Sequence, residues 1–202
     1  MKSNSLTSPI TSLIPLFALL TFLMLATRGN HFETFNQLPS ASSAIFFIAG
    51  MYLRTIKSFW FFYLLSIVID LSTSYVRGQL GSCLTVAYPA LALSYAAMFA
   101  GGFYGRANWL NKSTLLNILQ ISTALVTASA IAFFISNGSF YLLSGYFIDP
   151  SLNEYILRVQ KYFFRSVSNP IFYVASVIMI DWVFNRFILP YATKNNVIHS
   201  KT

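Results

Sequence analysis

The sequence has few charged residues and almost no side chains of the kinds that hold metal ions. Only 9% of its 202 residues are Asp, Glu, Lys or Arg, whereas soluble domains carry about 25%. It contains one cysteine and two histidines, which excludes an internal disulfide and any zinc site built on paired cysteines. It also has no G-x-x-x-x-G-K-[ST], H-E-x-x-H or C-x-x-C motif, so P-loop nucleotide binding and the common zinc-protease and redox sites are excluded.

Apolar residues dominate instead. The chain is 56% hydrophobic and 17% aromatic, with a mean hydropathy of +0.62, which is typical of an integral membrane protein. The net charge of +8 could suggest nucleic acid as a partner. However, the basic residues stand at the ends of apolar runs and form no stripe, so we interpret them as membrane anchors and expect no nucleic-acid binding.

Six apolar segments, each bounded by charged residues, Gly, Pro or Asn, predict an all-α protein with six transmembrane helices in a single domain, residues 1–202. The first run has a single Lys2 before it and no A-x-A cleavage site after it, so we expect a retained span and not a signal peptide. The second segment is short for the roughly 20 residues that a spanning helix needs. The predicted spans are 9–27, 39–53, 59–76, 84–103, 115–135 and 169–189.

A further helix is expected between the fifth and sixth spans, over residues 151–165. Its apolar residues recur at helical spacing, with charged residues on the other faces, and Ser151 followed by Glu154 has the pattern of a capping box. We predict an amphipathic helix lying on the outer membrane surface. It could cover an outward-facing pocket, or it could be a plain interfacial helix.

The distribution of basic residues predicts which loops face the cytoplasm. Lysine and arginine are concentrated at the N-terminus, in the second–third and fourth–fifth loops and at the C-terminal end, so the positive-inside rule places both termini in the cytoplasm. We therefore expect His31 and Cys83 to lie together on the outer side of the membrane. His199 falls in the cytoplasmic tail, as an ordinary surface residue.

Cys83 and His31 are the candidate metal ligands. Cys83 follows Gly81 and Ser82 at a helix start, where the helix dipole favours a thiolate; an unreactive buried cysteine is the alternative. Imidazole is a common ligand, although a lone loop histidine is more often simply solvated. Two such ligands are too few for a bare zinc or nickel site. They suffice for a metal in a planar macrocycle, which supplies the equatorial nitrogens itself.

Asp70 and Tyr88 are the other candidate site residues. Asp70 lies inside the third predicted span, where a carboxylate costs at least about 2.5 kcal/mol, on a polar stripe that leads to Arg77. It could border a pocket or bind neighbouring helices. Tyr88 precedes Pro89 near the outer end of the fourth span, where it could reach the same pocket or anchor at the interface.

Two small-x-x-x-small pairs in the fourth segment, Ala96/Ala100 and Gly101/Gly105, predict close helix packing. Such pairs let two helix backbones approach each other. They indicate packing more often than a binding site.

The sequence resembles those of the BtuM-type vitamin B12 uptake proteins. These proteins are solitary relatives of the substrate-binding S-components of energy-coupling-factor transporters. The similarity covers most of the chain: six spans, His31 in the first outer loop, Asp70, and the run from Gly81 through Cys83 to Tyr88 and Pro89. It implies a transporter in the bacterial inner membrane that binds cobalamin at the periplasmic face and moves it inward. Cys83 and His31 would be axial ligands of the corrin cobalt, with Asp70 and Tyr88 supporting them.

The resemblance also implies a reaction, removal of cyanide from cyanocobalamin through the Cys83 thiolate. S-components that dock on a shared energising module carry an Ala-x-x-x-Ala ridge on the first helix, which this chain lacks, since Ala18 and Ala26 are eight residues apart. We therefore expect a corrinoid and the lipid bilayer as partners and no dedicated ATPase module. The alternatives are a membrane haem- or metal-binding redox or sensor protein, and a helical assembly subunit without a ligand.

Overall fold

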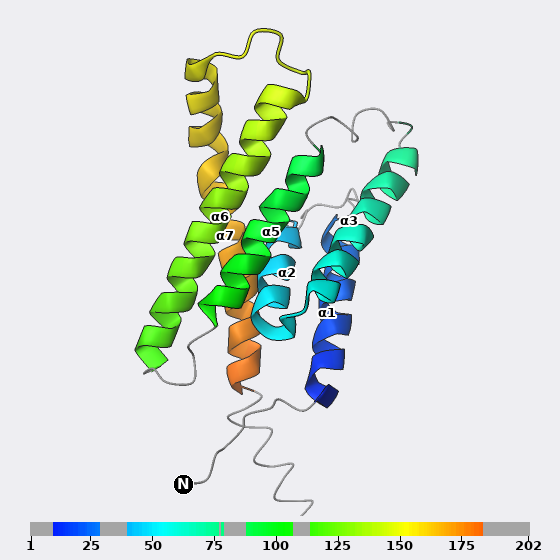
Figure 1. Ribbon diagram of the computed structural model, residues 1–202, viewed down its shortest axis with the longest axis vertical. Helices are drawn as coiled ribbons and strands as arrows, with labels where there is room; N and C mark the ends of the chain where they lie inside the picture. The colour runs from blue at the N-terminus through cyan, green and yellow to red at the C-terminus, as the bar shows by residue number, and fades with distance from the viewer. Residues whose placement is uncertain (1–9, 29–39, 77, 79–87, 107–113, 184–202) are drawn as a thin grey trace, which may run out of the picture.

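The computed structural model describes residues 10–28, 40–76, 78, 88–106 and 114–183. Every regular element within these residues is a helix, which confirms the all-α fold class. The helices stand side by side as one elongated bundle (Figure 1). In chain order they are α1 (Ile10–Arg28), α2 (Ser42–Ile48), the π-helix η1 (Ala49–Leu53), α3 (Ile56–Val76), α5 (Tyr88–Gly105), α6 (Thr114–Leu143) and α7 (Leu152–Val183).

Three of these helices are long and apolar enough to cross a membrane: α3, most of α6 and most of α7. Shorter apolar helices cover residues 13–28 and 42–53. The chain is thus compatible with a membrane protein, and a helix stands in each predicted segment. Residues 84–87 and 184–189 of the predicted fourth and sixth spans lie outside the described part of the chain.

The C-terminal half of the bundle differs from the sequence prediction. The surface helix expected over residues 151–165 and the sixth segment form one unbroken helix, α7, which contains Pro170. α7 packs along α6, as the contact between Phe133 and Phe163 shows. Half of the predicted capping box forms: the backbone N–H of Glu154 donates to Oγ of Ser151 at 3.3 Å, but the N–H of Ser151 donates to the hydroxyl of Tyr141 and not to the Glu154 carboxylate. α6 also extends eight residues past the predicted end of the fifth span.

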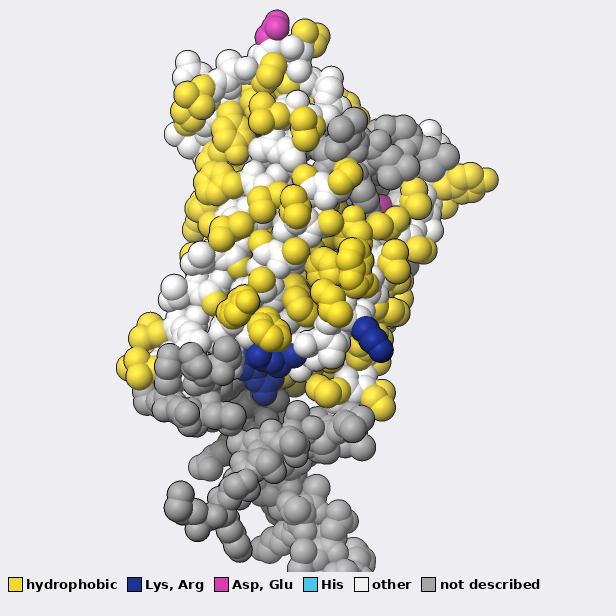
Figure 2. Space-filling model, in the orientation of Figure 1, with side chains coloured by type: hydrophobic (Ala, Val, Ile, Leu, Met, Phe, Trp, Pro, Cys, Tyr) yellow, Lys and Arg dark blue, Asp and Glu magenta, His cyan; other side chains and the backbone are white. Residues whose placement is uncertain are grey.

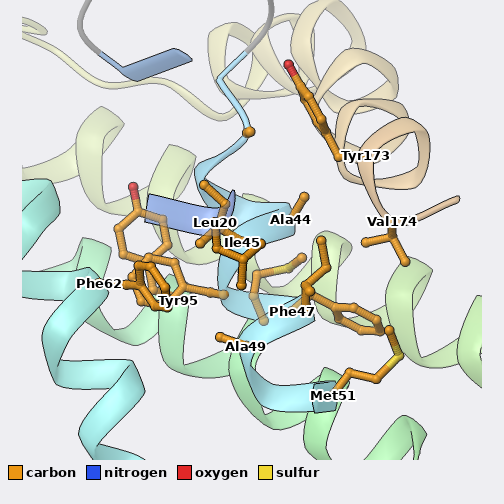
Figure 3. Packing of buried hydrophobic residues seen from close by; sticks show 14 of the residues in the cluster. Leu20, Ala44, Ile45, Phe47, Ala49, Met51, Phe62, Tyr95, Tyr173 and Val174 are labelled. Atoms are coloured by element: carbon orange, nitrogen blue, oxygen red, sulfur yellow. The ribbon is translucent and has the colours of Figure 1, made fainter. Parts of the chain in front are cut away.

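The short helix α2–η1 is the centre of the bundle. Eight consecutive residues, 44–51, are buried, and Leu20, Phe62, Tyr95 and Val174 from four other helices surround them (Figure 3). A helix that is apolar on all sides needs such a position. Its twelve residues extend about 18 Å, which is short of a hydrocarbon core of about 30 Å. The stabilisation among membrane helices comes from close packing, since lipid is as apolar as the core.

Glycines bring α2–η1 and α5 into backbone contact. A Cβ on Gly50 would lie 2.0 Å from the carbonyl oxygen of Phe99, and one on Gly102 would lie 1.9 Å from that of Phe47. Neither position has room for a side chain. On the neighbouring face of α5, Gly101 and Gly105 pack against Ala128 and Ala124 of α6, which confirms the predicted helix-packing role of that pair.

The two ends of the bundle are different. At the end here called the Arg28 end, α1, α3 and α6 end while α2, α5 and α7 begin, and the α6–α7 hairpin extends furthest (Figure 1). At the opposite end, called the Arg54 end, α1 begins and α7 ends. Basic side chains gather toward the Arg54 end, an acidic one marks the opposite tip, and much of the surface between them is apolar (Figure 2).

Candidate polar site at the Arg28 end

An ion pair joins α1 to α3. Nε and Nη2 of Arg28, the last residue of α1, donate to the two carboxylate oxygens of Asp70, each at 2.7 Å. The side chains are only 9% and 21% exposed. A bidentate arginine–carboxylate pair fixes both distance and orientation. It also neutralises an acid that would otherwise be expensive inside an apolar helix.

The same guanidinium reaches two further helices. Nη1 of Arg28 donates to Oγ of Ser42, at the start of α2, at 2.8 Å and also to the hydroxyl of Tyr95 in α5. Tyr95 is stacked on Phe46, with ring centroids 4.2 Å apart. One arginine therefore ties together α1, α2, α3 and α5. We call Arg28, Ser42, Asp70 and Tyr95 the Arg28 cluster.

A second contact joins the end of α1 to the start of α2. The backbone N–H of Ala41 donates to Oγ1 of Thr27 at 3.1 Å, beside the bond from Arg28 to Ser42. Residues 27–28 and 41–42 are thus held at one place. The intervening segment, which carries His31, starts and ends at the Arg28 cluster.

A cavity of about 210 Å³ lies beside this cluster, between α2, α5, α6 and α7. Its walls are unusually rich in hydroxyl groups and contain no charged side chain. Ser42 and Tyr95 belong both to the cavity wall and to the Arg28 cluster. The wall also holds Leu91, Met98, Ala132, Phe133, Asn169, Pro170 and six further serines, at positions 40, 43, 94, 129, 136 and 166.

The polar groups on the α5–α6 side of the cavity are already engaged. Ser94 donates to the carbonyl oxygen of Ala132 at 3.0 Å, Ser129 contacts the sulfur of Met98 at 3.8 Å, and Ser136 donates to the carbonyl of Phe133. On the α2–α7 side, the side chains of Ser43, Ser166 and Asn169 make no hydrogen bond within the described residues. The polar side chains on the α5–α6 wall of the cavity are thus hydrogen-bonded, whereas those three on the α2–α7 wall are not.

Of the predicted site residues, the structure describes the side chain of Asp70 but not those of Tyr88, Cys83 and His31. Asp70 lies in the Arg28 cluster, in the helix-joining role considered for it from the sequence. Tyr88 is the first residue of α5, and its side chain is not described. Cys83 and His31 lie outside the described residues, so their expected meeting is untested. Within the described residues, no group of three His, Cys, Asp or Glu side chains could hold a metal.

Arg28, which joins four helices, is the principal site residue that the sequence analysis did not single out. The signal was present: an acid in the middle of an apolar segment needs a cation close by, and Arg28 directly follows another apolar segment. The sequence gives no direct indication of the serine-lined cavity, whose serines come from four separate helices and from Ser40, which precedes α2.

Neither a protein-family model nor a curated protein matches this chain.

Proposed function

We propose that this protein is an inner-membrane transporter that binds cobalamin at the Arg28 end and moves it toward the Arg54 end. Cys83 and His31 are the axial ligands of the corrin cobalt, one on each face of the ring. Asp70 acts by holding Arg28, and Tyr88 borders the ring. This proposal starts from the resemblance of the sequence to the BtuM-type proteins.

The observation that carries the proposal is the Arg28 cluster. His31 follows Arg28 by three residues, and even a fully extended chain of that length covers only about 10 Å. Cys83 precedes Tyr88, the start of α5, by five residues, or about 17 Å at most. Arg28 bonds to Tyr95 of α5, about 10 Å along the helix from Tyr88. The segments that carry the two candidate ligands are therefore each joined to a helix at the Arg28 end, which favours the proposal.

The charges at the two ends support the proposed orientation. Arg54 and Arg106 lie at the Arg54 end, where each donates to a backbone carbonyl of the neighbouring helix, and Lys57 is exposed near them. Cytoplasmic loops are enriched in such residues. Asp149 and Glu154 lie at the opposite tip, near the start of α7. In the proposed orientation, the Arg28 end faces the periplasm and both termini are cytoplasmic.

The chemistry of the bound state is a ligand exchange at cobalt. In cyanocobalamin the Cys83 thiolate forms a cobalt–sulfur bond as the cobalt–cyanide bond breaks, and cyanide leaves with its electron pair. No oxidant or reductant is needed. A thiolate suits this role because it is a soft and charged donor.

The absorption spectrum of the purified full-length protein tests this function. Protein from cells supplied with vitamin B12 should carry a corrinoid whose spectrum is altered by a cobalt–sulfur bond, and Cys83→Ala should abolish that alteration. An unchanged spectrum in Cys83→Ala would refute ligation by Cys83. A Soret band would instead favour the haem-binding alternative. No chromophore at all would favour an assembly subunit.

Transport is tested by growth. A strain that requires vitamin B12 and lacks its own importer should grow on limiting vitamin B12 when this chain alone is supplied, and not with Cys83→Ala. His31→Ala should weaken corrinoid binding less than Cys83→Ala does, because the neutral imidazole is the weaker donor. Equal dissociation constants for the two variants would contradict that ranking.

A further inference from the structure

The serine-lined cavity is built for a neutral guest. No charged side chain lines it, so a bound ion would be desolvated without a partner, at a large energetic cost. Arg28 touches the cavity residues Ser42 and Tyr95 but is neutralised by Asp70. A carboxylate or an ammonium group therefore finds no counter-charge there.

The unused polar groups indicate which neutral guest fits. Ser43, Ser166 and Asn169 can each donate and accept hydrogen bonds, and none does so within the described residues. Pro170 has no N–H, so it leaves the carbonyl oxygen of Ser166 without its usual helical donor. A matching guest must both donate and accept hydrogen bonds. A primary amide offers two donors and one acceptor in a compact, uncharged group.

We infer that this cavity is a subsite that holds a primary amide side chain of the bound molecule, with Ser43, Ser166 and Asn169 as its hydrogen-bond partners. The inference rests on the proposed function, since cobalamin carries uncharged primary amides around its corrin ring. A volume of about 210 Å³ corresponds to about seven water molecules at about 30 Å³ each, so it accepts a side chain and not the ring. The ring itself stays outside the cavity.

Equilibrium binding of cyanocobalamin to the purified full-length protein tests this subsite. Ser166→Ala and Asn169→Ala should each weaken binding about three- to tenfold, as expected for one lost hydrogen bond. Ser168→Ala is the matched control, since Ser168 is on the same helix but outside the cavity lining and should bind as the parent does. The melting temperatures of the unliganded variants should be unchanged, because these side chains have no bonds to lose.

A second measurement identifies the amide itself. Among isomeric corrinoids in which one peripheral amide is hydrolysed to a carboxylate, one isomer should bind at least about tenfold more weakly than cyanocobalamin, because its charge enters an uncharged cavity. That difference should shrink in the Ser166→Ala/Asn169→Ala double variant, whose dissociation constants for the isomers should converge.

The outcomes separate this inference from the proposed function. If cyanocobalamin binds but the cavity variants match the parent and all isomers bind alike, the subsite is refuted while the proposed function stands. If no corrinoid binds to the folded protein, both are overturned.

Discussion

Arg28 and Asp70 meet across 42 residues of sequence in a bidentate ion pair whose two N–O distances are both 2.7 Å. This pair determines how α1 and α3 stand relative to each other. It also places the start of the segment that carries His31. The fold and the candidate site therefore depend on the same contact.

Breaking this pair from one side should be strongly destabilising. Asp70→Asn leaves the Arg28 guanidinium buried without a counter-charge, which costs about 3–5 kcal/mol of unfolding free energy. Arg28→Met/Asp70→Leu removes both charges and should cost less than either single change. Unfolding in detergent, followed by circular dichroism, measures the difference, with Lys57→Met at an exposed position as the control. A double variant as unstable as the sum of the singles would contradict this account.

Alanine at the α2–α5 contact should disrupt the bundle. Gly102→Ala places a methyl group 1.9 Å from the Phe47 carbonyl oxygen, so the helices must separate, at a cost of about 1–3 kcal/mol. Gly138→Ala in α6 meets only the Tyr155 hydroxyl at 3.4 Å and should gain up to about 1 kcal/mol from helix propensity. Melting temperatures of the two variants should move in opposite directions. A stable Gly102→Ala protein would mean that the two backbones are further apart than described.

The hydroxyl of Tyr141 should hold the α6–α7 hairpin closed. It accepts the N–H of Ser151 at 2.8 Å and lies 3.0 Å from the carboxylate of Glu154. Tyr141→Phe should cost about 1–2 kcal/mol locally and speed amide hydrogen exchange in the first turn of α7. Tyr155→Phe is the matched control, because its ring packs on Tyr141 while its hydroxyl makes no hydrogen bond within the described residues. Equal exchange rates in the two variants would exclude this role.

Because the chain has a single cysteine, labelling of that thiol can report the membrane orientation. A membrane-impermeant maleimide added to intact spheroplasts should label Cys83, and bound cobalamin should protect it. In a Cys83→Ala background, Ile148→Cys at the hairpin tip, where the parent side chain is 94% exposed, should be labelled without protection. Thr55→Cys at the Arg54 end should react only after lysis. Labelling of Thr55→Cys in intact spheroplasts would invert the proposed orientation.

Helix positions could be predicted from the sequence where the end of an apolar run coincides with the end of a helix, as for α1 and α3. They could not be predicted where polar residues lie inside a helix. Residues 136–139 of α6 and 165–169 of α7 resemble boundaries, yet the helices continue through them, because helical hydrogen bonds are local and do not require apolar side chains. Pro170 removes one such bond, and the packing of α7 along α6 and α2 holds the helix together around it.

The candidate site was less accessible to sequence reasoning than the fold. Asp70 was recognisable because an acid in an apolar run is costly, but its partner was not, since pairing depends on which helices become neighbours. Gly50 and Gly102 gave no sign of their contact either, because they lie on different helices and form no spaced pair together. The packing role of Gly101 and Gly105 could be predicted, since both glycines lie on one face of the same helix.

The direct backbone contact at Gly50 and Gly102 limits how this molecule can change shape. No side chain stands between α2 and α5 there, so no rotamer change can let one helix slide past the other, and the two act as a stationary axis. A conformational cycle that opens first one end and then the other must therefore turn the flanking helices about this axis. On the α1–α3 flank, such a rotation would first have to release Arg28.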